Sequence, residues 1–272
     1  MKAKKILLCL FFDLRRSVCN IGFVSKVLLI SFVILISQSD IIKDFFVYSN
    51  IEGYDVIGLY NLMVHYDTFK LLLLLVLTSV YANSICIERN NHVFQYIVFR
   101  TGTKEYVFSK VITTLIASSL AYIAGLSIAF FALSRIIPLS EAVSPVVGDA
   151  NYMSFAFLTP HEHPYIWMTL TALLFLSSIN VFCILGLVSS LYIKDIMIVQ
   201  CIPSISYFML TSLTYFLPEI FYLPAYGNQV TLISENPWIN YFYKLVMNIV
   251  VTMLLAYILH SELRKQCDEG NY

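Results

Sequence analysis

The sequence carries little charge for its length. Only 12% of its 272 residues are Asp, Glu, Lys or Arg, whereas a soluble domain usually has about 25%. Hydrophobic residues make up 59% of the chain, and the mean hydropathy is +0.77. This composition excludes an ordinary soluble domain and predicts an integral membrane protein. The formal net charge is zero, so we expect no nucleic-acid partner.

The chain also lacks the residue patterns of common catalytic and metal sites. Its six cysteines are scattered without the paired spacing of a zinc or iron–sulfur site or of a disulfide framework. The triplet 161–163, His-Glu-His, is too tight for the zinc pattern, in which two His lie four residues apart. Gly53 and Gly58 have the spacing of P-loop glycines, but Leu59 and Tyr60 replace the Lys and Ser/Thr. We therefore expect no enzyme activity, metal or cofactor in this chain.

Long apolar runs are what the sequence has instead. Six of them are long enough to cross about 30 Å of hydrocarbon as helices. We expect an all-α membrane protein of one domain with spans at about residues 21–38, 69–87, 108–134, 164–193, 196–218 and 238–261. No ionisable pair lies in the middle of a run, which argues against an ion-coupled pump or an intramembrane protease.

Residues 1–18, ahead of the first span, have the pattern of a helix lying in the bilayer interface. Apolar side chains such as Leu7 and Phe11 fall on one side at helical spacing, while Lys5, Asp13 and Arg16 fall on the other. We expect the polar side to face water. These charges also interrupt the apolar run that a signal peptide needs.

Lysine and arginine are distributed unevenly between the two sides of the expected bundle. With the amino terminus inside, twelve of them lie at the cytoplasmic side and only Lys43 and Arg135 lie outside, while Lys26, Lys70 and Lys244 fall at span ends. This bias follows the positive-inside rule. We therefore expect a multi-pass protein of the cell membrane with both termini in the cytoplasm.

Three segments are expected on the outer side, at residues 40–67, 135–163 and 219–236. The first two are too long for tight turns and favour short interfacial helices. In the third, Pro218 and Pro224 break any long helix. That segment can be re-entrant or an ordinary loop.

The segment 87–110 is the sizeable polar stretch between two membrane-length runs, and it carries several cations. Asn90 or Asn91 can cap a short helix, and Gly102 can end it. The apolar side of that helix would consist of Val93, Phe94, Tyr96 and Ile97. We expect a helix over residues 91–99 that lies across the cytoplasmic membrane surface and meets a partner.

Five features follow one another between the second and third spans. An acidic–basic pair comes after the second span and is followed by a short amphipathic helix and a small turn. An aromatic residue and a Ser-Lys pair then open the third span. The residues are Glu88, Arg89, Phe94, Arg100, Gly102, Tyr106, Ser109 and Lys110. This arrangement resembles the permease subunits of type-2 ATP-binding-cassette (ABC) exporters, and the six-span layout of the whole chain agrees with it.

The resemblance implies that the short cytoplasmic helix couples the chain to an ABC ATPase. The coupling residues would be Glu88, Arg89, Asn91, Phe94, Tyr96, Ile97 and Arg100. ATP and Mg²⁺ would bind to that separate subunit, and a second permease, identical or related, would complete the path. The amino-terminal helix would also touch the ATPase or would simply anchor the chain. A peptide or antibiotic-like amphiphile is the expected substrate, and a non-transport membrane scaffold or sensor component is the alternative.

Two further patterns lie within the expected spans. Small residues recur every four positions at Ala117, Ala121, Gly125 and Ala129, which lets another helix approach closely, either within one subunit or at a subunit interface. Polar or helix-distorting residues inside the membrane should face protein or a water-filled path. Those considered as conduit-lining candidates are Asn180, Gln200 and Pro203.

Overall fold

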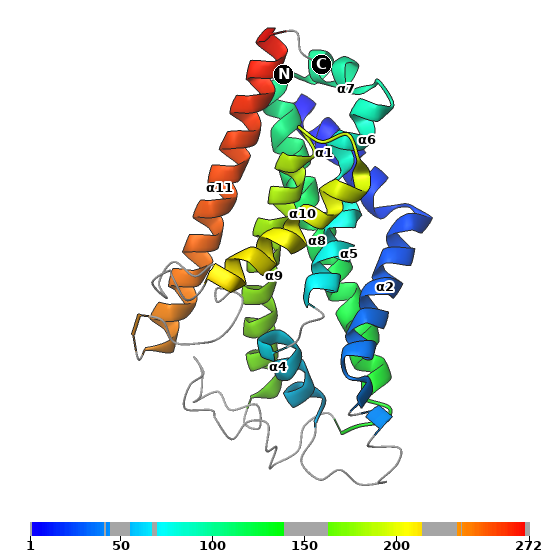
Figure 1. Ribbon diagram of the computed structural model, residues 1–272, viewed down its shortest axis with the longest axis vertical. Coiled ribbons are helices and arrows are strands. Elements are labelled where there is room, and N and C mark those ends of the chain that lie inside the picture. The colour runs from blue at the N-terminus through cyan, green and yellow to red at the C-terminus, as the bar shows by residue number, and fades with distance from the viewer. Residues whose placement is uncertain are drawn as a thin grey trace.

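The computed structural model describes residues 2–40, 42–43, 55–66, 70–138, 163–213, 233–234 and 236–269. Within these ranges the chain forms ten α-helices and no strand (Figure 1). They are α1 (Lys2–Val18), α2 (Ile21–Ser37), α4 (Val56–Tyr66), α5 (Lys70–Tyr81), α6 (Ser84–Asn90), α7 (Phe94–Thr101), α8 (Thr103–Leu133), α9 (Pro164–Ser189), α10 (Ile196–Ser212) and α11 (Pro237–Glu269).

The described residues contain three to five candidate membrane spans. The helices α8, α9 and α11 are long and apolar enough to cross a membrane. The pairs α1–α2 and α5–α6, bent by 58° and 49°, are also long and apolar enough if each pair is taken as one span. The chain is thus an all-helical protein with several candidate spans. The last expected residues of the fifth run, beyond Leu213, lie outside the described part.

The second expected span is not one straight helix. It breaks at Ala82 and Asn83, where no proline or glycine occurs, and α6 continues to Asn90 instead of ending at residue 87. Asn83 has φ −84° and ψ 4° ahead of α6. Asparagine favours helix boundaries because its side chain competes for backbone hydrogen bonds. The bend turns α6 relative to α5 and gives the chain its approach to α7.

The central helix is α8, which packs on α1, α2, α5, α9 and α11. Its small-residue stripe is buried within the same chain and faces α2 at Gly125. A Cβ atom on Gly125 would lie 2.5 Å from Ile30 Cγ2 and 3.1 Å from the carbonyl oxygen of Val27. Only glycine permits this approach, so the stripe serves packing within one chain.

The short helix α4 packs into the end of the bundle opposite α7 (Figure 1). Val56 and Leu59 are buried with Leu133 of α8. The ring centroids of Tyr60 and Phe130 lie 5.6 Å apart. A helix therefore does form in the segment 40–67, but it is buried in the bundle instead of lying on an interface. Most of the segments 135–163 and 219–236, including His161 and Glu162, lie outside the described residues.

Candidate functional site

The candidate site is the end of the bundle where α6, α7 and α8 meet. There α7 lies across the bundle, and the start of α1 and the end of α11 reach the same end (Figure 1). The expected short helix is present but begins at Phe94, because Asn91 caps the carboxyl end of α6. His92 has a φ of 57° in the connection. Gly102, with a φ of 97°, separates α7 from α8, as a residue without Cβ can do at low cost.

The two sides of α7 have different environments. Phe94 is only 3% exposed. Its ring packs edge-on against the ring of Tyr106 of α8, with 5.7 Å between the ring centroids. Val98, one turn later, is also buried, and Ile97 is partly buried. Phe94, one of the expected coupling residues, is thus buried within this chain, and its ring fixes α7 to α8.

The outer side of α7 exposes two aromatic rings and a cation. Tyr96 is 72% exposed and Phe99 is 73% exposed, and Arg100 beside them is exposed too. Phe99 was not among the residues singled out from the sequence. Its position five residues after Phe94 places it on the opposite side of the helix, a signal that helical periodicity already contained.

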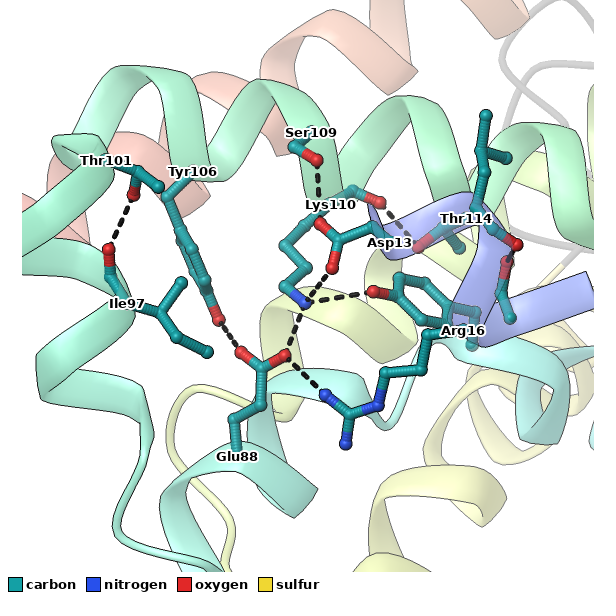
Figure 2. A network of polar contacts seen from close by, with 12 residues as sticks. Asp13, Arg16, Glu88, Ile97, Thr101, Tyr106, Ser109, Lys110 and Thr114 are labelled. Carbon is teal, nitrogen blue, oxygen red and sulfur yellow. Dashed lines mark hydrogen bonds and ion pairs between the residues drawn. The ribbon is translucent and has the colours of Figure 1, made fainter. Parts of the chain in front are cut away.

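Beneath α7, four charged side chains from three helices converge in the protein interior (Figure 2). Lys110 Nζ of α8 lies 2.6 Å from Glu88 Oε1 of α6 and 3.0 Å from Asp13 Oδ1 of α1. Nζ also donates to Tyr81 OH at 2.9 Å. Arg16 of α1 reaches Glu88 Oε1 at 3.1 Å. We call Asp13, Arg16, Glu88 and Lys110 the charge cluster.

The charge cluster is balanced and fully hydrogen-bonded. Its two carboxylates face two cations, and the side chains of Lys110 and Glu88 are each only 1% exposed. Tyr106 OH donates to Glu88 Oε2 at 2.7 Å, and Ser109 Oγ donates to Asp13 Oδ2 at 2.7 Å, so all four carboxylate oxygens have a donor. Buried ions are tolerated only under such conditions. The charge cluster therefore joins α1, α6 and α8 to one another, and we also call it the clamp.

The clamp takes one residue of the polar side of α1 out of water. Asp13 was expected to face water, yet it is 4% exposed and packs on α8. Leu7 and Phe11 are 65% and 67% exposed. Asp13 therefore faces the protein, whereas Lys5 and Arg16 of the same polar side are exposed, as are Leu7 and Phe11 of the apolar side. Of the twelve cations assigned to the cytoplasmic side, Lys110 is not in water but in this clamp.

The neighbouring residues of α6 bind to a different part of the chain. Arg89 Nη1 donates to the carbonyl oxygen of Leu191, and Asn90 Nδ2 donates to that of Lys194 at 2.9 Å. Both acceptors lie in the connection between α9 and α10. Glu88 and Arg89 are thus adjacent in sequence but hold α6 to opposite neighbours.

The three conduit-lining candidates are not brought together. Asn180 of α9 exchanges hydrogen bonds with Ser118 and Ser119 of α8, at 2.7 and 3.1 Å. Pro203 is buried inside α10 and would lie 3.0 Å from a Cβ on Gly186 of α9. Asn180 and Gly186 point to different sides of α9, and Gln200 is only partly buried.

No known family, curated protein or solved structure matches this chain.

Proposed function

We propose that this chain is the transmembrane subunit of an ABC exporter, which moves substrate out of the cytoplasm with ATP hydrolysed by a separate subunit. The observation that carries the proposal is the outer side of α7. Tyr96 and Phe99 are more than two-thirds exposed on a short helix at the end of the bundle, next to Arg100. Aromatic rings and arginine are the residue types that most often anchor protein interfaces.

The way α7 is held supports a role in transmitting force. Phe94 fixes it to Tyr106, Tyr106 bonds to Glu88, and Glu88 binds Lys110 and Arg16. A displacement of α7 by an ATPase would thus reach α8 and α1 through short, buried contacts. In this proposal α7 is the coupling helix, and Glu88 acts from inside the protein, not on the ATPase surface.

The proposal includes six spans, with both termini and α7 in the cytoplasm. The uneven distribution of Lys and Arg supports it, and so does the position of α7 at the same end as the start of α1 and the end of α11. The ATPase would supply ATP and Mg²⁺, and a second permease subunit would complete the path. The substrate class that we propose is a peptide or antibiotic-like amphiphile.

The direct test co-expresses the chain with ABC ATPase subunits of the same cell and purifies any complex through a tag on this chain. Truncating a buried interface aromatic costs about 2 kcal/mol or more, roughly thirtyfold in affinity. Tyr96→Ala and Phe99→Ala should therefore weaken co-purification and abolish substrate-stimulated ATP hydrolysis. Tyr165→Ala and Phe242→Ala, which remove rings 66% and 57% exposed elsewhere, are the matched controls and should leave both unchanged.

Normal assembly and stimulation in both α7 variants would refute α7 as the coupling element. Association without any effect of substrate on ATP hydrolysis would favour the scaffold or sensor role. Phe94→Ala should behave differently from the two α7 variants. It removes a core ring, which typically costs about 3–5 kcal/mol, so it should lower the stability of the isolated chain as well as the coupling.

The orientation has its own test. A cysteine introduced at Arg100, in a background without the exposed Cys19, should react with an impermeant thiol reagent in inverted vesicles and not in intact cells. Labelling in intact cells would reverse the topology.

A further inference from the structure

A groove of about 970 Å³ runs between α8, α9 and α11. Its walls are mostly apolar, with Val107, Val111 and Leu115 on α8 and Ile249, Met253 and Ala256 on α11. A volume near the upper end of the usual range for ligand sites can hold a large amphiphile. The groove is separate from the clamp and from the exposed side of α7.

The groove has the length of one lipid. Its lining on α11 extends from Asn248 to Arg264, sixteen residues along the helix, or about 24 Å at 1.5 Å per residue. One leaflet with its headgroups is about 20–22 Å thick. At the deep end Asn248 Nδ2 donates to Ser177 Oγ of α9 at 2.8 Å, while the buried Oδ1 of Asn248 has no hydrogen-bond partner among the described residues. The lining at this end therefore mixes polar side chains, such as Ser177, Asn180 and Asn248, with apolar ones.

The two ends of the groove differ in charge. At the end near α7 the lining includes Lys104 and Arg264, and no carboxylate is among the lining residues that the structure describes. Lys104 makes no ion pair within the described ranges, and Arg264 has only an exposed contact of 3.8 Å with Asp268. His260, one turn before Arg264, has a buried Nε2 without a hydrogen-bond partner among the described residues. This end of the groove is therefore cationic, and its side chains can donate hydrogen bonds to a bound molecule.

We infer that the groove binds a phospholipid with an anionic headgroup. The acyl chain lies against α8 and α11, where its burial is favourable, and the phosphate lies between Lys104 and Arg264. After a rotation of its ring, His260 can bond to a headgroup oxygen. Basic pockets between membrane helices are typical sites for anionic headgroups. The inference does not depend on transport or on an ATPase.

The experiment uses the purified full-length chain in detergent, without any partner. Binding of phosphatidylglycerol and of phosphatidylcholine with the same acyl chains is measured by native mass spectrometry. We expect phosphatidylglycerol to bind more tightly. The double variant Lys104→Gln/Arg264→Gln should lose roughly tenfold to thirtyfold in affinity for phosphatidylglycerol and little for phosphatidylcholine. Lys265→Gln is the matched control, because Lys265 adjoins Arg264 but does not line the groove, and it should bind like the wild type.

A second variant tests the location without removing charge. Ala256→Trp fills the groove between α8 and α11 and should reduce the binding of both lipids. Equal binding of the two lipids by the wild type, or an unchanged affinity for phosphatidylglycerol in the double variant, would overturn the inference. So would a dimer that Ala256→Trp dissociates, because a second copy of the chain would then be the occupant. None of these results would bear on the role proposed for α7.

Discussion

Replacing Lys110 with methionine removes the cation at the centre of the clamp while keeping the length and the apolar stem of the side chain. Three contacts of Nζ disappear, to Glu88 at 2.6 Å, to Asp13 at 3.0 Å and to Tyr81 at 2.9 Å. Arg16 remains, with 43% of its side chain exposed, as the one cation of the cluster facing two buried carboxylates.

The expected loss of stability is large because removing one partner leaves the other charges buried. Such changes cost about 3–5 kcal/mol, far more than the 0–1 kcal/mol of an exposed pair. A loss of that size corresponds to a melting temperature lower by roughly 5–9 °C in a chain of this length. Adding Asp13→Asn restores charge balance, because Glu88 and Arg16 still form a pair. The double variant should regain about 1–2 kcal/mol over Lys110→Met alone.

Thermal unfolding can be followed with a dye that reacts with newly exposed thiols, because Cys86 and Cys183 are buried. Lys265→Met, which removes an exposed lysine, is the control and should melt within about 1 °C of the wild type. A similarly small shift for Lys110→Met would refute the clamp as a source of stability. A double variant less stable than Lys110→Met would refute the reasoning about charge balance.

Three further changes test other contacts by their effect on stability. Gly125→Ala should lower the melting temperature, because the added Cβ meets Ile30 Cγ2 at 2.5 Å and the overpacking cost of about 1–3 kcal/mol exceeds the gain in helix propensity of about 1 kcal/mol. A rise in melting temperature would contradict this close packing. Tyr106→Phe removes only the hydroxyl that donates to Glu88 and should lower the free energy of unfolding by about 1.5–3 kcal/mol in the same assay. An unchanged melting temperature would show that this hydrogen bond contributes nothing to stability. Asp195→Ala removes the side chain that accepts from two backbone N–H groups of α10, at 2.8 and 3.3 Å. It should lower the free energy of unfolding by about 1 kcal/mol and speed amide exchange at the start of α10. Equal exchange in Asp195→Ala and Asp195→Asn would argue against the cap.

Much of the helical layout could be read from the apolar runs, because each long run has to satisfy its backbone within a helix. The third run was expected at 108–134 and forms α8 from Thr103 to Leu133, and the fourth was expected at 164–193 and forms α9 from Pro164 to Ser189. The amino-terminal helix and the short helix before α8 were also expected. Run length predicts where helices occur, but it does not predict bends such as the one at Asn83.

The candidate site was harder to predict, because periodicity does not say whether a polar side faces water or protein. Glu88, Tyr106, Ser109 and Lys110 were grouped from their order in the sequence, and the structure places them together. Asp13 was assigned to water because nothing local distinguishes it from an exposed carboxylate. Its partner Lys110 follows 97 residues later, and only tertiary structure reveals such a pairing.

That separation has a consequence for synthesis of the chain at the membrane. Asp13 is made 97 residues before its partner Lys110, and Glu88 is made 22 residues before it. Until α8 is inserted, the first helix has a carboxylate that only nearby arginines and water can satisfy. We therefore expect α1 to stay at the headgroup level during translation and to dock only after residue 110 has left the ribosome. Chains truncated before Lys110 should be recognised and degraded as unassembled.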